Sequence, residues 1–288
     1  MADVNQQQIG GYRLRTNLNS AQYTQVFECV EPMSNRHFAM KVLLPEHADN
    51  KEQRSVLFRE AEIGIKLRHE NIIQIVKVDK SPTNPFFIME YFPAGSLRKR
   101  MFEKDFNFIK EHSAKIFKQM ATGLAYMHGS GYVHCDIKPD NILVNAVGEL
   151  KLIDFAISKK ILTGFAKWFY RKKKAEGTRT YMSPEQLQGK MVDAQADVYS
   201  FGATMYELLT FKKPFTGTSF VDLENKIILQ KPESPSMHNK ELTDDICNLI
   251  LRMMQKDKKM RPANCHEVMI ELRKIRIFKN QKKVEETS

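Results

Sequence analysis

The chain has 288 residues, of which 42% are hydrophobic and 27% are charged. This length and composition provide one large domain or two lobes with a sizeable core. No apolar run approaches the roughly 18 residues that a membrane span needs. The start, from Met1 to Gln8, has neither a basic stretch nor an apolar middle, so we expect no leader peptide, no transmembrane segment and a cytoplasmic protein.

The charge and the cysteines exclude further classes. A formal charge of +11 suits nucleic acid, an anionic membrane or acidic protein partners. The sequence shows no motif of a known nucleic-acid-binding domain, so we expect that the protein does not bind nucleic acid. The cysteines lie far apart without a Cys-x-x-Cys pair, which indicates neither a zinc site nor a disulfide framework. They are Cys29, Cys135, Cys247 and Cys265.

The first third of the chain predicts strands and one helix. Residues 12–30 predict two strands joined by a turn, and residues 38–42 predict a strand that contains Lys41. Residues 51–67 predict a helix that carries Glu60 and Glu62. Because these two positions lie on different helix faces, only one of the glutamates can point inward.

The following elements are an apolar strand and two helices. Residues 86–90 predict a strand, and the Pro-Ala-Gly-Ser run after it marks a boundary. Residues 112–128 carry a helical apolar stripe that indicates core packing. A hydrophobic helix is predicted through residue 209, with Asp197 near its start.

The stretch richest in chemistry is residues 132–144. Two short apolar runs predict buried strands, and the polar loop between them carries Asp136, Lys138 and Asn141. Phosphoryl transfer needs an acceptor for the proton of the attacking hydroxyl, a cation for the moving phosphoryl and an oxygen ligand for a metal ion. One loop therefore supplies all three groups.

These residues resemble the catalytic loop of the eukaryotic-type serine/threonine protein kinase family, with Cys135 where that family has arginine. Residues 38–42 resemble its Val-Ala-Ile-Lys strand. Residues 154–156 resemble its Asp-Phe-Gly motif, and residues 177–185 its Gly-Thr-x-x-Tyr-Met-Ala-Pro-Glu segment. The resemblance covers residues 12–277, nearly the whole chain.

The resemblance implies an α+β, bilobal protein-kinase fold. Residues 1–91 would form a small antiparallel-sheet N-lobe with one main helix, and residues 92–277 a larger, mainly helical C-lobe. Residues 278–288 would be a charged tail. The implied activity is that of a transferase that moves the γ-phosphoryl of ATP, bound with Mg²⁺, to serine or threonine hydroxyls of a protein substrate.

The resemblance also assigns roles to single residues. Asp136 and Lys138 would act on the substrate hydroxyl and the moving phosphoryl, while Lys41, steered by Glu60, would bind the α and β phosphates. Asn141 and Asp154 would hold the metal ion. The nucleotide-binding positions would be Leu18, Val26, Ala39, Lys41, Met89, Glu90, Phe92 and Leu143.

Further positions are expected to hold the C-lobe together. Thr178 would hydrogen-bond Asp136 and Lys138. Glu185 would pair with Arg261, far along the chain. Asp197 would bind the backbone of the catalytic loop, and His134 would be a packed structural residue.

The sequence departs from the family at three places: the glycine-rich loop, Gly64, and Ala156, which stands where the family has the glycine of Asp-Phe-Gly. The positions of Gly-x-Gly-x-x-Gly fall on Asn19, Ala21 and Thr24, and because glycine alone adopts positive φ at no steric cost, we predict weaker phosphate clamping. Gly64, one turn after Glu60, predicts an unfilled contact on Phe155. A second hypothesis is therefore a pseudokinase-like nucleotide-binding scaffold. A small-molecule phosphotransferase generally lacks the 177–185 segment.

Two more features carry hypotheses. In many kinases, the arginine that corresponds to Cys135 binds a phosphate on the activation segment, which here spans residues 154–185. A thiol cannot bind phosphate in this way, so we expect activity without phosphorylation of Thr163, Thr178 or Thr180. The alternative interpretation of Cys135 is that it is a catalytic nucleophile beside His134. Residues 167–174, from Lys167 to Lys174, are either a docking strip for an acidic partner or a loop with solvated charges.

Overall fold

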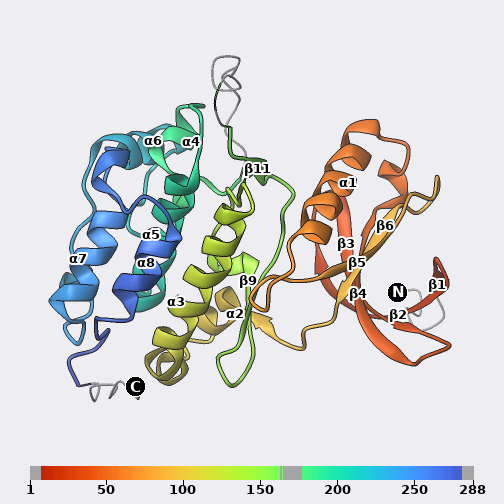
Figure 1. Cartoon of the computed structure of the whole chain (residues 1–288), viewed down its shortest axis with the longest axis horizontal. Helices are drawn as coiled ribbons and strands as arrows, with labels where there is room; N and C mark the ends of the chain where they lie inside the picture. The colour runs from red at the N-terminus through yellow and green to blue at the C-terminus, as the bar shows by residue number, and fades with distance from the viewer. Residues whose placement is uncertain (1–7, 163, 165–176, 281–288) are drawn as a thin grey trace. The chain divides into compact units, whose positions relative to one another are not determined.

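The computed structural model describes residues 8–162, 164 and 177–280. The chain divides into two compact units. The first consists of Met1–Pro93 and Ile153–Ala156, and the second of Ala94–Leu152 and Ile157–Ser288. Figure 1 shows the chain, with all the α-helices and most of the strands labelled.

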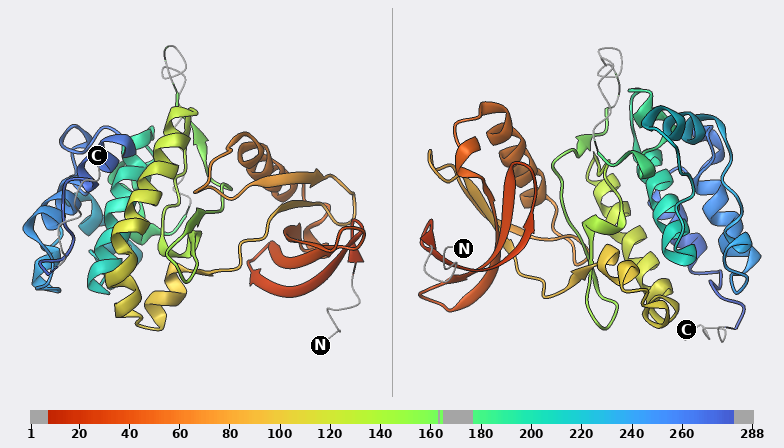
Figure 2. Two further views of the ribbon diagram at one scale, coloured as in Figure 1. Left: turned by 60° about the horizontal axis from the view of Figure 1, so that its bottom comes forward. Right: turned by 180° about the vertical axis from the view of Figure 1, so that it is seen from behind.

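The first unit is built on a curled antiparallel sheet with strand order β1-β2-β3-β4-β6-β5, and Figure 2 shows how strongly β2 and β3 bend. The strands are β1 (Gln8–Ile9), β2 (Tyr12–Ser20), β3 (Thr24–Glu31), β4 (Arg36–Leu43), β5 (Ile75–Asp79) and β6 (Phe86–Glu90). Alternate side chains pack on one face in a core that includes Leu14, Cys29 and Met40. The predicted strands are thus confirmed.

Helix α1 (Lys51–Lys66) packs on β4, β5 and β6. Asn50 begins it by accepting hydrogen bonds from the amides of Glu52 and Gln53, and this satisfies two amides that lack a partner within the helix. Leu57 and Ala61 lie on the buried face, in a second apolar cluster with Phe87 of the sheet. The helix ends one residue before the predicted Leu67, which caps it.

The turn between β2 and β3 is closed without positive φ angles. The amide of Ala21 donates to the carbonyl of Thr24 at 2.9 Å, and Ser20 pairs with Gln25. None of the residues from 19 to 24 has a positive φ. The hairpin therefore follows a path open to residues with side chains, as the loss of the glycines requires.

The second unit is mainly helical. Its helices of more than one turn are α2 (Leu97–Phe102), α3 (Phe106–Gly129), α4 (Pro184–Leu187), α5 (Ala194–Thr210), α6 (Phe220–Leu229), α7 (Asp244–Met253) and α8 (Cys265–Leu272). α5 is buried along almost all of its length between α3, α7 and α8. Asp105 caps α3, which begins six residues before the predicted stripe at 112.

Short strands position the polar loop of this unit. β9 (Ile142–Val144) pairs with β10 (Leu150–Leu152) and β7 (Gly95–Ser96), and β8 (Tyr132–Val133) pairs with β11 (Lys159–Lys160). The two predicted strands around Asp136 are therefore β8 and β9. The pairing of β8 with β11 was not predicted.

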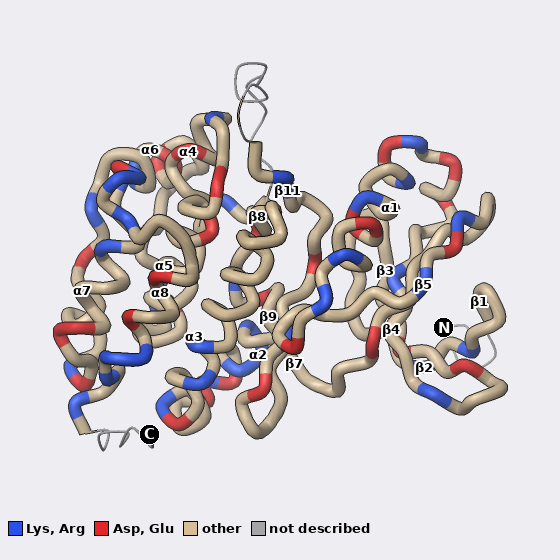
Figure 3. Tube along the Cα trace, in the orientation of Figure 1, with Lys and Arg blue, Asp and Glu red and all other residues tan. Residues whose placement is uncertain are grey.

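The α+β organisation expected from the sequence is confirmed, with a sheet and α1 in the first unit and a helical second unit. Figure 3 shows basic and acidic residues interspersed along the helices. Within the described residues, no helix is both long and apolar enough to cross a membrane.

Candidate functional site

Lys41 lies on β4 and forms an ion pair with Glu60 of α1. Lys41 Nζ donates to both carboxylate oxygens of Glu60, at 2.8 and 2.7 Å. Only 4% of the Glu60 side chain is exposed, against 67% of Glu62, which pairs with Lys66 instead. The structure thus decides between the two candidate glutamates in favour of Glu60.

Asp154 lies beside this pair, in the part of the first unit that comes from later in the chain. Its Oδ1 is 3.5 Å from Lys41 Nζ. Its φ of 69° lies in the left-handed region, which aspartate tolerates better than most residues. The Phe155 amide donates to the Glu60 carboxylate. Lys41, Glu60 and Asp154 are therefore joined in one cluster.

The charges of this cluster shift one another. Burial would lower the pKa of Lys41, but the carboxylates of Glu60 and Asp154 raise it above its ordinary value. Burial raises the pKa of Glu60 to about 7, although Lys41 opposes this change. Lys41 therefore remains a cation, the form that binds phosphate oxygens.

The predicted gap at Gly64 is wrong. A Cβ placed on Gly64 would lie 2.4 Å from Ile75 Cδ1 and 3.3 Å from the Phe155 ring. The side chain of Ile75, from β5, already fills the space in which the family's bulky residue was expected. Gly64 is therefore the residue that makes room for Ile75, and Phe155 is fully buried.

The polar loop of the second unit gathers its groups on one carboxylate oxygen. Asp136 Oδ2 accepts from Lys138 Nζ at 2.7 Å and from Asn141 Nδ2 at 2.8 Å. Asn141 Nδ2 also donates to the Asp136 carbonyl at 2.9 Å. Thr178 Oγ1 accepts from Lys138 Nζ at 3.0 Å, but the described contacts include no bond from Thr178 to Asp136.

Asp197 of α5 holds the backbone of this loop. Its carboxylate accepts from the amides of His134 and Cys135, both at 2.8 Å, and from His128 Nε2 at 2.9 Å. Asp197 and His134 are fully buried. The predicted role of Asp197 as an anchor is confirmed, and His128 of α3 is a partner that the sequence did not indicate.

The segment after residue 177 is anchored by polar pairs. Glu185 and Arg261 form a buried, two-pronged ion pair at 2.8 and 3.0 Å, as predicted. Gln186 Nε2 donates to the carbonyl of Cys135 at 2.9 Å, which ties this segment to the polar loop. Arg98, Tyr181 and Glu207 form a further hydrogen-bonded group that the sequence did not predict.

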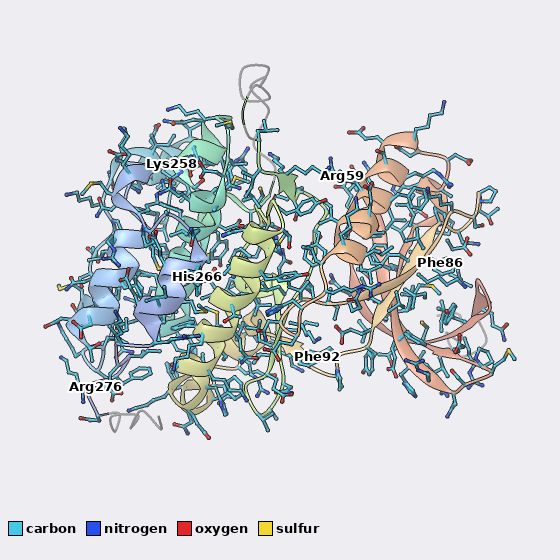
Figure 4. All side chains as sticks on the ribbon, viewed as in Figure 1. Arg59, Phe86, Phe92, Lys258, His266 and Arg276 are labelled. Carbon is cyan, nitrogen blue, oxygen red and sulfur yellow. The ribbon has the colours of Figure 1, made fainter. Side chains whose placement is uncertain are left out.

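Most of the expected nucleotide-binding residues lie in the first unit. Leu18 is 44% exposed on β2. Ala39 of β4 pairs with Met89 of β6 in the sheet. The amide of Glu90 donates to the Gln74 carbonyl at 2.9 Å, so it is already engaged within the sheet. Phe92 lies in the segment after β6 (Figure 4). The others are Val26, on β3, and Leu143, which is on β9 in the second unit.

The expected metal ligands suit magnesium rather than zinc. Asn141 makes its hydrogen bonds through Nδ2, which leaves Oδ1 as the atom that would ligate a metal ion. Asp154 supplies a carboxylate, the hard oxygen donor that magnesium prefers. Within residues 8–162, 164 and 177–280, no three His, Cys, Asp or Glu side chains gather as a closed metal site. An amide oxygen and a carboxylate are both donor types that magnesium accepts.

Two expected features lie outside the described residues: Thr163 and the basic stretch 167–174. The four cysteines are all described, and each is free and buried. Cys135 packs with Val133, Val192 and Ala196, which argues against a solvent-accessible nucleophile.

Residues 12–271 match the family described as protein kinase domain. A probable serine/threonine-protein kinase of Clostridium acetobutylicum is 31% identical over 268 residues, which are 92% of this chain and 40% of that protein. One of Streptomyces coelicolor is 28% identical, over 91% of this chain and 39% of the relative. Serine/threonine-protein kinase PknB of Mycobacterium leprae is 29% identical, over 86% of this chain and 40% of that protein. The chain thus spans about 40% of the length of these relatives.

Proposed function

Because the chain belongs to the protein kinase family, we propose that it transfers the γ-phosphoryl of MgATP to serine or threonine hydroxyls of a protein substrate. The observation that carries the proposal is the arrangement around Asp136. Two donors hold Oδ2 of this carboxylate, so Oδ1 is the atom that would accept the proton of the attacking hydroxyl.

Gly177 supports this assignment of Oδ1. A Cβ added to Gly177 would lie 3.1 Å from Asp136 Oδ1, and the φ of Gly177 is +113°. Glycine therefore keeps the space beside this oxygen open, where a substrate hydroxyl would arrive.

The other residues supply charge and orientation. Lys138, between Asp136 and Thr178, would stabilise negative charge on the moving phosphoryl. Lys41 would hold the α and β phosphates while Glu60 keeps its ammonium in place. Asn141 and Asp154 would hold Mg²⁺, which neutralises charge on the phosphates. ATP and Mg²⁺ are the cofactors of this proposal.

The test is transfer of label from γ-³²P-ATP to a generic basic protein substrate, followed by identification of the labelled amino acid. Asp136→Asn should lower the turnover by about a hundredfold or more, the usual effect of losing a general base. Asp140→Asn is the matched control, because Asp140 lies on the same loop and pairs with Arg98. It should keep most of the turnover.

A second candidate, a nucleotide-binding scaffold without phosphotransfer, is favoured by the hairpin from residue 19 to 24, which has none of the three family glycines. In that case wild type and Asp136→Asn would give the same background label. Labelled phosphoserine or phosphothreonine that disappears in Asp136→Asn would exclude the scaffold.

We also propose that activity does not depend on a phosphate on the activation segment. Cys135 takes the place of a phosphate-binding arginine and packs with Ile157 and Ile161, which lie at the start of that segment. Apolar packing thus anchors the segment where an arginine would need a phosphate. Substitution by alanine of Thr163, Thr178 and Thr180, one at a time, is the test. Loss of activity at Thr163 that glutamate restores would contradict the proposal.

Two further proposals concern partners and location. The basic stretch 167–174 is proposed to dock an acidic partner, and replacing Lys172, Lys173 and Lys174 by Glu should then raise KM for an acidic protein substrate but not for a basic one. Equal KM changes for both substrates would reject docking.

A cytoplasmic location is supported by the four cysteines, none of which forms a disulfide. A disulfide at Cys29 or Cys247, found in protein isolated with its thiols blocked, would reject this location.

A further inference from the structure

Arg59, directly before Glu60 on α1, reaches a backbone carbonyl far along the chain. Its Nη2 donates to the carbonyl oxygen of Ala156 at 2.5 Å, across 97 residues of sequence. Figure 4 labels Arg59 on α1. Both residues belong to the first unit, since Ile153–Ala156 packs there.

The choice of partner is informative. Within the part of the chain that the structure describes, the Ala156 carbonyl is the one polar partner of the Arg59 side chain. An arginine on a helix surface commonly pairs with a carboxylate three or four residues away, and Glu62 lies three residues after Arg59. Arg59 instead uses its charge on a neutral carbonyl, directly after Asp154-Phe155.

Glu60 holds the same turn at the preceding residue. Its carboxylate accepts from the Phe155 amide as well as from Lys41. The Ala156 amide in turn lies 3.4 Å from Asp154 Oδ1. Two neighbouring residues of α1 therefore hold two successive residues of the turn. Glu60 binds the amide of Phe155, and Arg59 binds the carbonyl of Ala156.

The turn needs such support because Asp154 has a φ of 69°. A left-handed backbone costs a non-glycine residue roughly 1 kcal/mol and persists only when surrounding contacts hold it. The contacts from Arg59 and Glu60 to this turn therefore help to hold the backbone that carries the Asp154 carboxylate.

We propose that Arg59 is a positioning residue for Asp154: it holds the Asp154-Phe155-Ala156 turn so that the carboxylate is set in advance for Mg²⁺. This inference rests on the proposed function, since it assigns Asp154 to the metal. Arg59 itself touches neither the metal nor the nucleotide. Its loss should weaken metal binding while Lys41 still binds phosphate.

The variants are Arg59→Met, which keeps most of the stem and removes the donors, and Arg59→Lys, which restores a cation. Lys51→Met is the matched control, because Lys51 is an exposed cation at the start of the same helix. Binding of a non-hydrolysable ATP analogue is measured by calorimetry across a Mg²⁺ series, together with thermal unfolding.

Arg59→Met should raise the Mg²⁺ concentration for half-maximal analogue binding by about five- to tenfold, the effect of losing one exposed charge-assisted hydrogen bond. Arg59→Lys should recover part of this loss, and Lys51→Met should show none. Analogue binding without Mg²⁺ should stay unchanged, and the unfolding temperature serves to show that the variant is folded. A Mg²⁺ response equal to that of Lys51→Met, or an equal loss with and without Mg²⁺, would overturn the inference.

Hydrogen exchange of the Phe155 amide separates this inference from the proposed function, because it needs no nucleotide. Faster exchange at Phe155 in Arg59→Met, but not in Lys51→Met, supports the role of Arg59 whether or not the chain transfers phosphate. Unchanged exchange overturns it. If the wild type binds no analogue at any Mg²⁺ concentration, the proposed function fails, and the exchange result still decides on Arg59.

Discussion

Asp197 shows how much a single buried carboxylate supports. It accepts from the amides of the adjacent residues His134 and Cys135 and from the ring N–H of His128, so it binds two separate places in the chain. Cys135 has a φ of 69°, so the backbone next to Asp136 is held in the left-handed region. The position of Asp136 therefore depends on a residue that takes no part in the chemistry.

Asp197→Asn should lower the free energy of unfolding by about 2–4 kcal/mol, because one buried donor loses its acceptor and the remaining bonds lose their charge. Urea unfolding measures this change. Asp245→Asn, on the exposed start of α7, should change stability by less than about 0.5 kcal/mol. Equal changes in the two variants would contradict the anchoring role.

The cysteines allow a prediction about pH. Burial raises the pKa of Cys29 to about 12, and burial also raises those of Cys247 and Cys265. Because the thiolate is the reactive form, the folded protein should react only in traces with Ellman's reagent from pH 7 to 9, and at four thiols in urea. Stoichiometric reaction of the folded protein at pH 8 would contradict this.

The raised pKa of Cys29 also determines whether stability rises or falls with pH. An unfolded thiol loses its proton near pH 9, whereas folded Cys29 keeps its proton until about pH 12. The unfolded state therefore binds fewer protons in this window, and the contribution of Cys29 to stability falls as the pH rises from 9 towards 12. Cys29→Ala should flatten this part of the stability curve.

At the scale of elements, α1 and β5 are fitted to each other by a small residue opposite a large one. Gly64 gives its space to Ile75, and a Cβ at Gly64 would also approach the Phe155 ring. Gly64→Leu should destabilise the protein by about 1–3 kcal/mol through overpacking, and Ile75→Ala by about 2–4 kcal/mol through a cavity.

The double variant should be more stable than the sum of the two changes predicts, by about 1 kcal/mol or more, because the new leucine fills the space left by isoleucine. A double-mutant cycle in urea measures this coupling. Gly202→Leu, in α5, offers a comparison, since a Cβ there would meet Met253 rather than Ile75. Strict additivity of Gly64→Leu and Ile75→Ala would show that the two positions do not share one space.

These elements also show what the sequence could predict. The pairs Lys41–Glu60 and Glu185–Arg261 were predicted because each partner belongs to a motif of fixed spacing. Ile75 could not be assigned, because three isoleucines lie within residues 72–75 and nothing in the pattern marks which one packs on Gly64.

Arg59 was missed for a different reason. Its partner is a backbone carbonyl, which every residue possesses, so no residue type signals the contact. The same holds for the turn between β2 and β3. The loss of the glycines predicted an altered path there, but only the structure shows that the amide of Ala21 donates to the carbonyl of Thr24.

At the scale of the whole molecule, the proposed chemistry draws on both units. The first unit contains Lys41, Glu60 and Asp154, and Lys41 forms ion pairs with both carboxylates within this unit. Asp136 and Asn141 come from the second. The proposed function requires that the chain binds ATP and Mg²⁺. The central claim is that it does so although the family glycines are absent.

A titration of ATP with and without Mg²⁺ tests that claim most directly. The wild type should bind ATP, and Mg²⁺ should increase the affinity by at least about tenfold. Lys41→Met should weaken binding in both conditions, whereas Asp154→Asn should abolish mainly the gain from Mg²⁺. ATP binding that is absent in the wild type, or that neither substitution changes, would contradict the account.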